Sequence, residues 1–333
     1  MTTRQLGRSG LAVSRLGLGL AAVGRPGYIN LGRARDLPGE RTPEALYART
    51  AELLDAARAA GIRYVDVARS YGRAEEFLAR WVRERAVPPG TLTIGSKWGY
   101  RYTAEWRVDA PVHEEKELSL ARFTAQLAET RALLGPHLDL YQIHSATAES
   151  GCLEDASLLR ALVEGRRAGA YRAVGLTLSG PTSARALELV RAARADGEPV
   201  FDVVQATFNC LDPSLAAPLA GAHDAGLGVI VKEALANGRL TAVNDRPEDA
   251  GLMSALGETA GRLACGIDQL ALAFVLAEPF VDVVLSGAAT TAQLASHLGA
   301  RSLTLDPEMH AALAALAEPP ARYWQTRGTL RWS

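Results

Sequence analysis

Short apolar segments alternate along this chain with longer segments of helical periodicity. The short segments are rich in β-branched residues or leucine, and several are apolar at every position, as expected for parallel strands that are covered on both faces. We predict eight such strands, at residues 13–20, 64–68, 92–97, 138–144, 173–178, 201–207, 228–232 and 281–285.

The longer segments carry helix signals at their ends. Thr42, followed by Pro43 and Glu44, predicts a capped helix that runs to Gly61, and Ser119 begins another that ends at Gly135. Further helices are predicted at residues 155–169, 182–196, 214–225, 268–277 and 290–298, with an additional C-terminal helix near 307–316.

This alternation of eight strands with helices predicts a (β/α)₈ barrel. The competing fold is a doubly wound open sheet, and residues 17–22 match the loose GxGxxA form of a dinucleotide fingerprint. The match is attributed to chance, because Val-Gly-Arg-Pro-Gly follows where a helix should begin. Residues 2–12, with a turn at Gly7-Arg8-Ser9-Gly10, predict a hairpin before the barrel. Because no linker or repeat interrupts the pattern, we expect one domain over residues 1–333.

Composition narrows the possible environments and partners. The 333 residues are 48% hydrophobic and 22% charged, which is typical of a globular protein. The net charge of −1 provides no basic field for nucleic acid or an acidic membrane, so neither is expected as a partner. No signal core follows Met1, and the longest apolar run, 270–277, is too short to span a bilayer. Three isolated cysteines show no metal-binding spacing, and a cytoplasmic location is expected.

Candidate catalytic residues stand at or near the ends of three predicted strands. Asp66 lies near the end of the second strand, Lys97 ends the third, His144 ends the fourth, and Tyr71 follows Asp66 by five residues. In a barrel these residues converge at one end. A phenol is a weak acid at neutral pH, and a neighbouring ammonium is expected to lower its pKa while a carboxylate orients the ammonium. This set suits protonation of a carbonyl oxygen during hydride transfer, with the histidine as a hydrogen-bond partner of that oxygen.

The segments that carry these residues, 61–72, 94–97, 138–144 and 201–209, resemble the aldo-keto reductase superfamily in order along the chain. The resemblance implies a (β/α)₈ barrel and nicotinamide-dependent interconversion of a carbonyl and an alcohol, with Tyr71 as general acid/base. It also implies NADP(H), the usual cofactor of the family. NAD(H) remains an alternative. At the positions where the family often has a cation that binds the 2′-phosphate of NADP, this chain has the uncharged residues Gly287, Ala289 and Gln293.

The resemblance also implies where the cofactor binds. Gln205 corresponds to the residue that holds the nicotinamide carboxamide, and the segment after the eighth strand corresponds to the adenosine phosphate site at a helix N-terminus. Two segments depart from the family pattern. Thr177-Leu178 stands in place of a Ser-Asn pair that contacts the carboxamide, and after the seventh strand, where the family commonly has an aromatic ring that stacks on the nicotinamide, this chain has Lys232-Glu233-Ala234. The expected cofactor contacts are Gln205, Thr177, Lys232, Leu235, Ser286, Gly287, Ala288, Thr290, Gln293 and His297.

Two long connections, residues 21–41 and 98–118, follow predicted strands at the end where barrel enzymes build their sites. The first carries four arginines (Arg25, Arg33, Arg35 and Arg41), and the second is rich in aromatic residues. We expect Tyr28, Trp98 and Trp106 to line a pocket for a sugar-like, aromatic or anionic carbonyl compound. The alternative for these arginines is a solvated rim.

Two alternatives to this enzymatic function stay open. The chain could instead be a nicotinamide-nucleotide-binding regulatory protein on the same fold, or an epimerase or lyase that uses the cofactor transiently. The substrate, the direction of reaction and the oligomeric state are not determined by the sequence.

Overall fold

The computed structural model describes residues 3–333 and contains a closed barrel of eight parallel strands, which confirms the predicted fold. Hydrogen bonding runs around the barrel in the order β12-β13-β14-β3-β4-β5-β8-β9 and closes from β9 to β12. The barrel strands are β3 (Leu16–Gly19), β4 (Tyr64–Asp66), β5 (Thr93–Trp98), β8 (Leu140–Ala146), β9 (Ala173–Leu178), β12 (Val203–Thr207), β13 (Gly228–Lys232) and β14 (Val283–Ser286).

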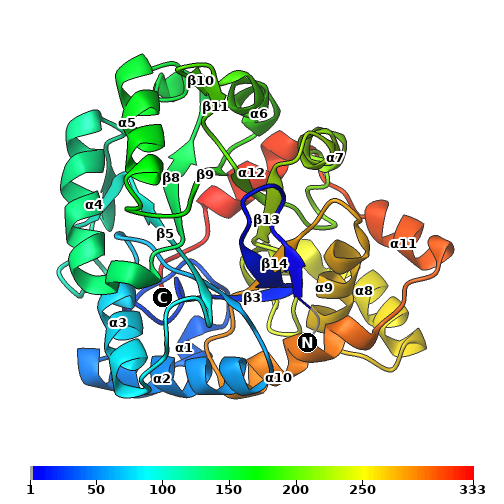
Figure 1. Ribbon diagram of the computed structural model, residues 1–333. Coiled ribbons are helices and arrows are strands. Elements are labelled where there is room, and N and C mark those ends of the chain that lie inside the picture. Colours follow the sequence, from blue (N-terminus) through cyan, green and yellow to red (C-terminus); the bar gives the residue numbers. More distant parts are fainter. Residues whose placement is uncertain (1–2) are drawn as a thin grey trace.

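Helices surround the barrel (Figure 1). The predicted caps at Thr42 and Ser119 are present, each accepting a hydrogen bond from a backbone N–H of the first turn. The structure also contains α1, α3, α8 and α12, for which no helix range had been predicted. The helices are α1 (Arg33–Asp36), α2 (Pro43–Ala59), α3 (Ala74–Glu84), α4 (Leu120–Leu134), α5 (Ala156–Arg167), α6 (Ser183–Ala192), α7 (Ala216–Asp224), α8 (Ala250–Arg262), α9 (Ile267–Ala277), α10 (Thr291–Gly299), α11 (Pro307–Ala314) and α12 (Pro320–Gly328).

The predicted N-terminal hairpin is present, but its boundary with the barrel was wrong. Residues 13–20 were expected to be one strand, whereas the chain breaks at Arg15 into β2 (Ala12–Ser14) and β3. β2 pairs antiparallel with β1 (Thr3–Gln5), and residue 2 of the predicted hairpin lies outside the described residues. At the turn, Gly7 has φ +51°, and a Cβ there would lie 2.1 Å from the backbone nitrogen of Gly228. Only glycine allows this close approach to the barrel.

The interior of the barrel changes from apolar to polar along its axis. Because successive strand residues face opposite sides, every second residue points inward. Near the strand N-termini the inward residues are apolar and pack with three hairpin residues; the set is Leu6, Leu11, Val13, Tyr64, Leu140, Ala173, Val203, Ile230 and Val283. Toward the strand C-termini, at the end that we call the mouth, the inward positions are mostly polar. They are Asp66, Lys97, Gln142, His144, Thr177, Gln205, Thr207 and Lys232.

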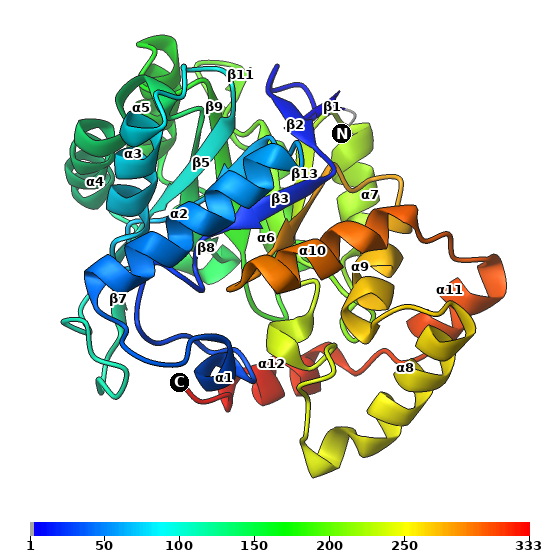
Figure 2. The same ribbon diagram turned by 90° about the horizontal axis from the view of Figure 1, so that it is seen from below.

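Long connections and the C-terminal helix gather at the mouth. Figure 2 shows α1, α12 and the C-terminus at one end of the barrel, and the β1–β2 hairpin at the other. The connection 98–118 contains a second hairpin, β6 (Tyr100–Tyr102) with β7 (Glu114–Lys116). A third pair, β10 (Arg194–Ala195) with β11 (Glu198–Pro199), follows α6.

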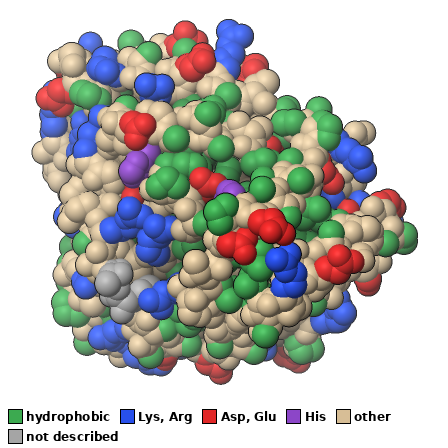
Figure 3. Space-filling view, turned by 90° about the vertical axis from the view of Figure 1, so that its right-hand side faces the viewer, with side chains coloured by type: hydrophobic (Ala, Val, Ile, Leu, Met, Phe, Trp, Pro, Cys, Tyr) green, Lys and Arg blue, Asp and Glu red, His purple; other side chains and the backbone are tan. Residues whose placement is uncertain are grey.

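Two general features bear on possible partners. In the described part of the chain no single helix is long and apolar enough to cross a membrane; only the bent pair 247–262 and 267–277 passes that test jointly, and most of α9 is buried against the barrel. On the face shown in Figure 3, basic and acidic side chains are interspersed with apolar ones.

The hairpin is predicted to stabilise the barrel by closing its apolar end. Leu6 is fully buried there, so we expect Leu6→Ala to lower the free energy of unfolding by about 3 kcal/mol, from lost burial and the cavity left behind. Urea unfolding followed by circular dichroism measures this. Leu120→Ala, at a leucine of α4 that is 37% exposed, is the control and should cost less than about 1 kcal/mol. Equal losses in the two variants would contradict this role of the hairpin.

Candidate active site

A buried ion pair lies at the centre of the polar layer. Lys97 is fully buried and its ammonium donates hydrogen bonds to Asp66 and, at 3.0 Å, to the carbonyl oxygen of Val67. The second carboxylate oxygen of Asp66 accepts from the hydroxyl of Tyr64 at 3.0 Å and from Nε2 of Gln205 at 2.9 Å. Burial lowers the pKa of Lys97, and the charge of Asp66 opposes that shift. These hydrogen bonds, from residues of several strands, hold the Lys97–Asp66 pair in place.

Tyr71 lies beside this ion pair. The ammonium of Lys97 is 4.6 Å from the centroid of the Tyr71 ring, and the ring meets the imidazole of His144 edge-on at 5.5 Å between centroids. The structure thus brings together the four residues that the sequence predicts as a set: Asp66, Tyr71, Lys97 and His144.

The expected direction of the Tyr71 pKa shift is wrong. Burial raises the pKa of the phenol well above its ordinary value, and the negative charge of Asp66 raises it further. The reason is the ion pair itself: the carboxylate that orients Lys97 also compensates its positive charge, so little field is left to favour a phenolate. The phenol is consequently protonated at neutral pH, the form from which a proton can be donated.

A local distortion of β8 accompanies the placement of His144 at the mouth. The register against β9 shifts between Ile143 and Ala146, and Ser145 has φ +56°, a conformation uncommon for a residue other than glycine. The imidazole lies against the ring of Tyr100, 4.9 Å between centroids. Burial and the charges of Lys97 and Lys232 hold the pKa of His144 well below its usual range. A neutral imidazole can donate one hydrogen bond to a substrate oxygen.

A second charged cluster stands where the sequence departs from the family pattern. The ammonium of Lys232 donates to the hydroxyl of Thr207 at 2.8 Å and lies 3.7 Å from the carboxylate of Glu233. Arg327 of α12 binds both oxygens of that carboxylate, at 2.9 and 3.1 Å from Nε. These cations outweigh burial and lower the pKa of Glu233 to about 2, while burial lowers the pKa of Lys232 to about 8. Sequence reasoning missed Arg327, because no motif links residues 94 positions apart.

The expected phosphate site lies at the start of α10. Thr290 caps this helix by accepting from the N–H of Gln293 at 3.1 Å, and Gln293 in turn accepts from the N–H of Ala289 at 2.8 Å. A Cβ built on Gly287 would have no atom within 4 Å, so the backbone is open to close approach there. This open backbone and the free N–H groups of a capped helix start fit the phosphate groups of a nucleotide.

Two residues expected to contact the cofactor face the protein instead. Ser286 points outward from β14, and its hydroxyl lies 2.8 Å from Nδ1 of His297. His297 is buried, and burial lowers its pKa to about 4 although Asp268 lies 3.7 Å away. The imidazole is therefore neutral at physiological pH and supplies no cation for a 2′-phosphate.

The remaining cofactor candidates lie at the mouth. Thr177 is fully buried, and its hydroxyl oxygen accepts from the N–H of Ser145 at 2.7 Å. Gln205 has its Nε2 engaged by Asp66. Lys232 ends β13 and Leu235 lies in the segment after it, and both side chains are partly buried. Ala288 is buried, and its N–H donates to Ser286.

The three residues expected to contact the substrate lie in different environments. Trp98 is fully buried and packs on Phe123 of α4, so its assignment to the pocket is wrong; it follows inward-facing Lys97 and must therefore face outward. Trp106 donates to the carbonyl of Arg41 and meets Phe77 of α3, which ties the two long connections together. Tyr28 packs under Arg25, whose guanidinium lies 5.3 Å from its ring.

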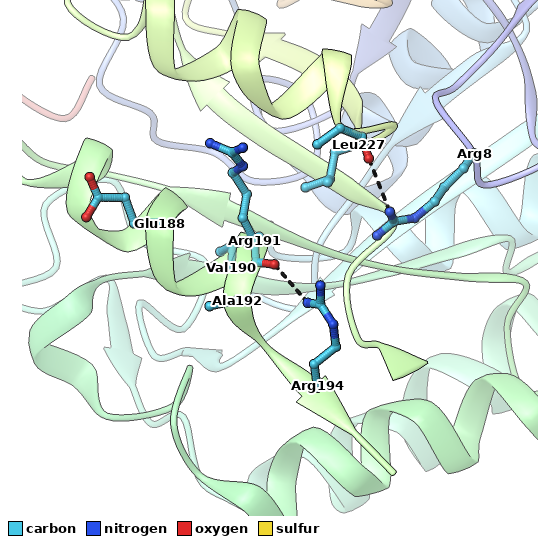
Figure 4. Close-up of a pocket in the computed structure, with 8 residues that line it drawn as sticks. Arg8, Glu188, Val190, Arg191, Ala192, Arg194 and Leu227 are labelled. Atoms are coloured by element: carbon cyan, nitrogen blue, oxygen red, sulfur yellow. Dashed lines mark hydrogen bonds between the residues drawn. The ribbon is translucent and has the colours of Figure 1, made fainter. Parts of the chain in front are cut away.

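A cavity of about 430 Å³ opens elsewhere on the surface (Figure 4). It is lined by Arg8, Glu188, Arg191 and Arg194, among others, and belongs to the hairpin end of the barrel. It is thus separate from the mouth. Among residues 3–333, no group of three or more histidines, cysteines or acidic residues is arranged to hold a metal ion.

Comparison with known proteins identifies the family of this chain. The sequence model that describes the Aldo/keto reductase family matches residues 16–318 of this chain, from the first residue of β3 to just before α12. The chain belongs to the aldo/keto reductase family. Members of this family are typically NAD(P)H-dependent oxidoreductases that act on small carbonyl compounds, and they typically use NADP(H).

Relatives are distant but cover nearly the whole chain. The aldo-keto reductase str7 of Strobilurus tenacellus is 23% identical over 96% of this chain and 92% of its own length. The holo form of an aldo-keto reductase from Bacillus halodurans superposes with a TM-score of 0.73 at 22% identity, covering 96% of this chain and 97% of that one. An aldo-keto reductase structure from Pseudomonas aeruginosa has a TM-score of 0.64 at 23% identity, covering 91% and 95%. At sequence identities this low, similarity to these solved structures establishes only the fold of this chain.

The carboxylate of Glu233 is predicted to make stability depend on pH. Its pKa of about 2 in the folded protein lies below the ordinary 4.5, so its contribution is complete above about pH 5 and disappears as pH falls toward 2. We expect Glu233→Gln to lower the free energy of unfolding by on the order of 3 kcal/mol at pH 6, and by progressively less at lower pH. Glu248→Gln, at an exposed glutamate, is the control for urea unfolding across this range. A difference that does not vary with pH would contradict the ion-pair account.

Proposed function

We propose that this chain interconverts a carbonyl compound and the corresponding alcohol, with Tyr71 as general acid/base and NADP(H) or NAD(H) as redox partner. The observation that carries the proposal is the meeting of a protonated phenol, a neutral imidazole and a buried Lys97–Asp66 pair at one end of the barrel. Such a set can hold a carbonyl oxygen and protonate it. When bound, the nicotinamide cofactor supplies or accepts the hydride.

The roles of the four residues follow from their environments. Tyr71 donates its proton to the carbonyl oxygen in the reductive direction and accepts it in the oxidative direction. Lys97 lies against the phenol ring, where its positive charge stabilises the phenolate left after proton transfer. Asp66 keeps that ammonium charged and in place, and His144, neutral because it is buried among cations, donates a hydrogen bond to the same oxygen.

The proposed cofactor contacts form two groups at the mouth, one for the nicotinamide and one for the phosphates. At the nicotinamide end stand Thr177, Gln205, Lys232 and Leu235. Because Lys232 is fixed by Thr207 and Glu233, it offers an ammonium rather than a ring to a bound nucleotide. At the phosphate end stand Gly287, Ala288, Thr290 and Gln293, and the open backbone at Gly287 suits the approach of an anion.

Loss of the Tyr71 hydroxyl is the direct test of the chemistry. We expect Tyr71→Phe to lower kcat by at least about 100-fold, because the proton donor is gone, while the Kd for NADPH changes by less than about threefold. A panel of aldehydes, ketones and sugars followed at 340 nm identifies a substrate, and tryptophan quenching gives Kd. Tyr47→Phe, in α2 and bonded to Glu84, is the matched control with activity unchanged. Full activity of Tyr71→Phe on a confirmed substrate would rule out this acid assignment.

Weak discrimination between the two nicotinamide cofactors is also expected. Gly287, Ala289 and Gln293 supply no cation for the 2′-phosphate, and His297 is neutral and buried. We therefore predict that the Kd values for NADPH and NADH differ by less than about tenfold at pH 7, since one lost ion pair removes most of the usual preference. Fluorescence titration of both cofactors measures this. A preference for NADPH above about 100-fold would mean that another cation reaches the phosphate.

A further inference from the structure

Two arginines of the connection 21–41 are buried at the mouth. Arg25 is 3% exposed and Arg33 is 2% exposed, although most arginines of globular proteins keep their guanidinium groups in water. α1, which begins at Arg33, lies at the same end of the barrel as α12 and the C-terminus in Figure 2. Neither residue is therefore part of a solvated rim.

The hydrogen bonds of these two side chains are incomplete. Arg25 donates from Nη1 to the carbonyl of Ser70 at 3.0 Å and to Glu114 at 2.9 Å, and Arg33 donates from Nη2 to the carbonyl of Arg25 at 2.8 Å. Nε of Arg25 and both Nε and Nη1 of Arg33 are buried and meet no acceptor among the described residues. Three donor nitrogens are thus left without an acceptor, where buried donors are normally satisfied.

The charges around Arg33 do not compensate it. Arg25 and Arg41 both lie close enough to lower its pKa, which burial and these cations bring to about 9, while the opposing effect of Asp36 is the smallest. Glu114 is already bonded to Arg25. Leaving a guanidinium buried without a carboxylate partner destabilises the folded protein. An incoming anion would recover that free energy, and its oxygens would satisfy the unused donors.

The position of this cluster ties it to the reaction site. The guanidinium carbon of Arg25 lies 5.6 Å from the centroid of the Tyr71 ring and 4.7 Å from the ring of Trp332. On its other side the same connection contacts the segment after β13, where the N–H of Leu31 donates to the carbonyl of Asn237 at 3.0 Å. Arg25 thus lies against the phenol ring, Arg33 is bonded to the backbone of Arg25, and the connection that carries both contacts the segment after β13.

We infer that Arg25 and Arg33 form a binding site for an oxyanion, a carboxylate or phosphate group, beside Tyr71. The anion belongs either to the carbonyl substrate or to the phosphates of the nucleotide, and the two sources share the same recognition chemistry. Only the assignment to a substrate rests on the proposed function; the anion site itself is tested without turnover.

The first experiment measures anion binding alone. Inorganic phosphate and pyrophosphate are titrated into the full chain by isothermal calorimetry, and Arg33→Gln is expected to weaken binding at least tenfold. Arg35→Gln is the matched control on the same helix, because Arg35 is exposed and donates only to the carbonyl of Val243 at 3.1 Å. Since no substrate is present, a failure of this experiment is distinct from a failure of the Tyr71 assignment.

The second experiment identifies the source of the anion. The ratio of kcat/KM for 4-carboxybenzaldehyde to that for benzaldehyde is compared between wild type, Arg33→Gln and Arg35→Gln, together with the Kd of NADPH. A ratio that falls at least tenfold in Arg33→Gln, with Kd unchanged, supports a substrate anion. A Kd that rises at least tenfold, with the ratio unchanged, supports the nucleotide phosphates.

A third variant separates binding from folding. Arg33→Met keeps the aliphatic part of the side chain and removes the uncompensated charge, so its Tm is expected to equal or exceed that of wild type while anion binding is lost. The inference is overturned if the anion affinity, the substrate ratio and the cofactor Kd of Arg33→Gln and Arg33→Met all equal those of Arg35→Gln, whatever the Tm of these variants. Arg33 would then act only as an internal brace.

Discussion

The buried pair between Lys97 and Asp66 is the interaction on which the rest of the mouth depends. A single charge at this depth would be strongly unfavourable, whereas the pair is held by the phenol of Tyr64 in β4, the carbonyl of Val67 just after β4 and the amide of Gln205 in the opposite strand β12. Because the charges compensate one another, the ammonium can lie against Tyr71 without ionising it. The phenol therefore keeps its proton, as the role proposed for Tyr71 requires.

The two ends of the barrel have different roles, and segments outside the barrel contribute side chains to each end. The N-terminal hairpin inserts apolar side chains into one end and supplies packing. At the other end, the inward positions are polar, and long connections and α12 bring further charges to them. Arg327 reaches Glu233, and Arg25 reaches Glu114, so that segments remote in sequence stabilise one another at the mouth.

The mouth carries more positive charge than its own carboxylates compensate. Lys232 places an ammonium at the mouth, and Arg25 and Arg33 add guanidinium groups with donors unused. The anionic groups proposed as ligands, on a nucleotide or on a substrate, would meet complementary charge there. The structure thus combines apolar packing at the hairpin end with uncompensated buried donors at the mouth, a cost in stability that is common at functional sites.

The sequence by itself determined the barrel and the meeting of Asp66, Tyr71, Lys97 and His144, because parallel strands must bring their C-terminal ends to one rim. Alternation along β5 also implied that Trp98 faces away from Lys97, although the aromatic composition of the loop pointed to a pocket. Only the tertiary structure decided the direction of the Tyr71 pKa shift, the neutrality of His297 and the partner of Glu233. These depend on how far each group is removed from water and on contacts between distant segments, neither of which is encoded in local pattern or spacing.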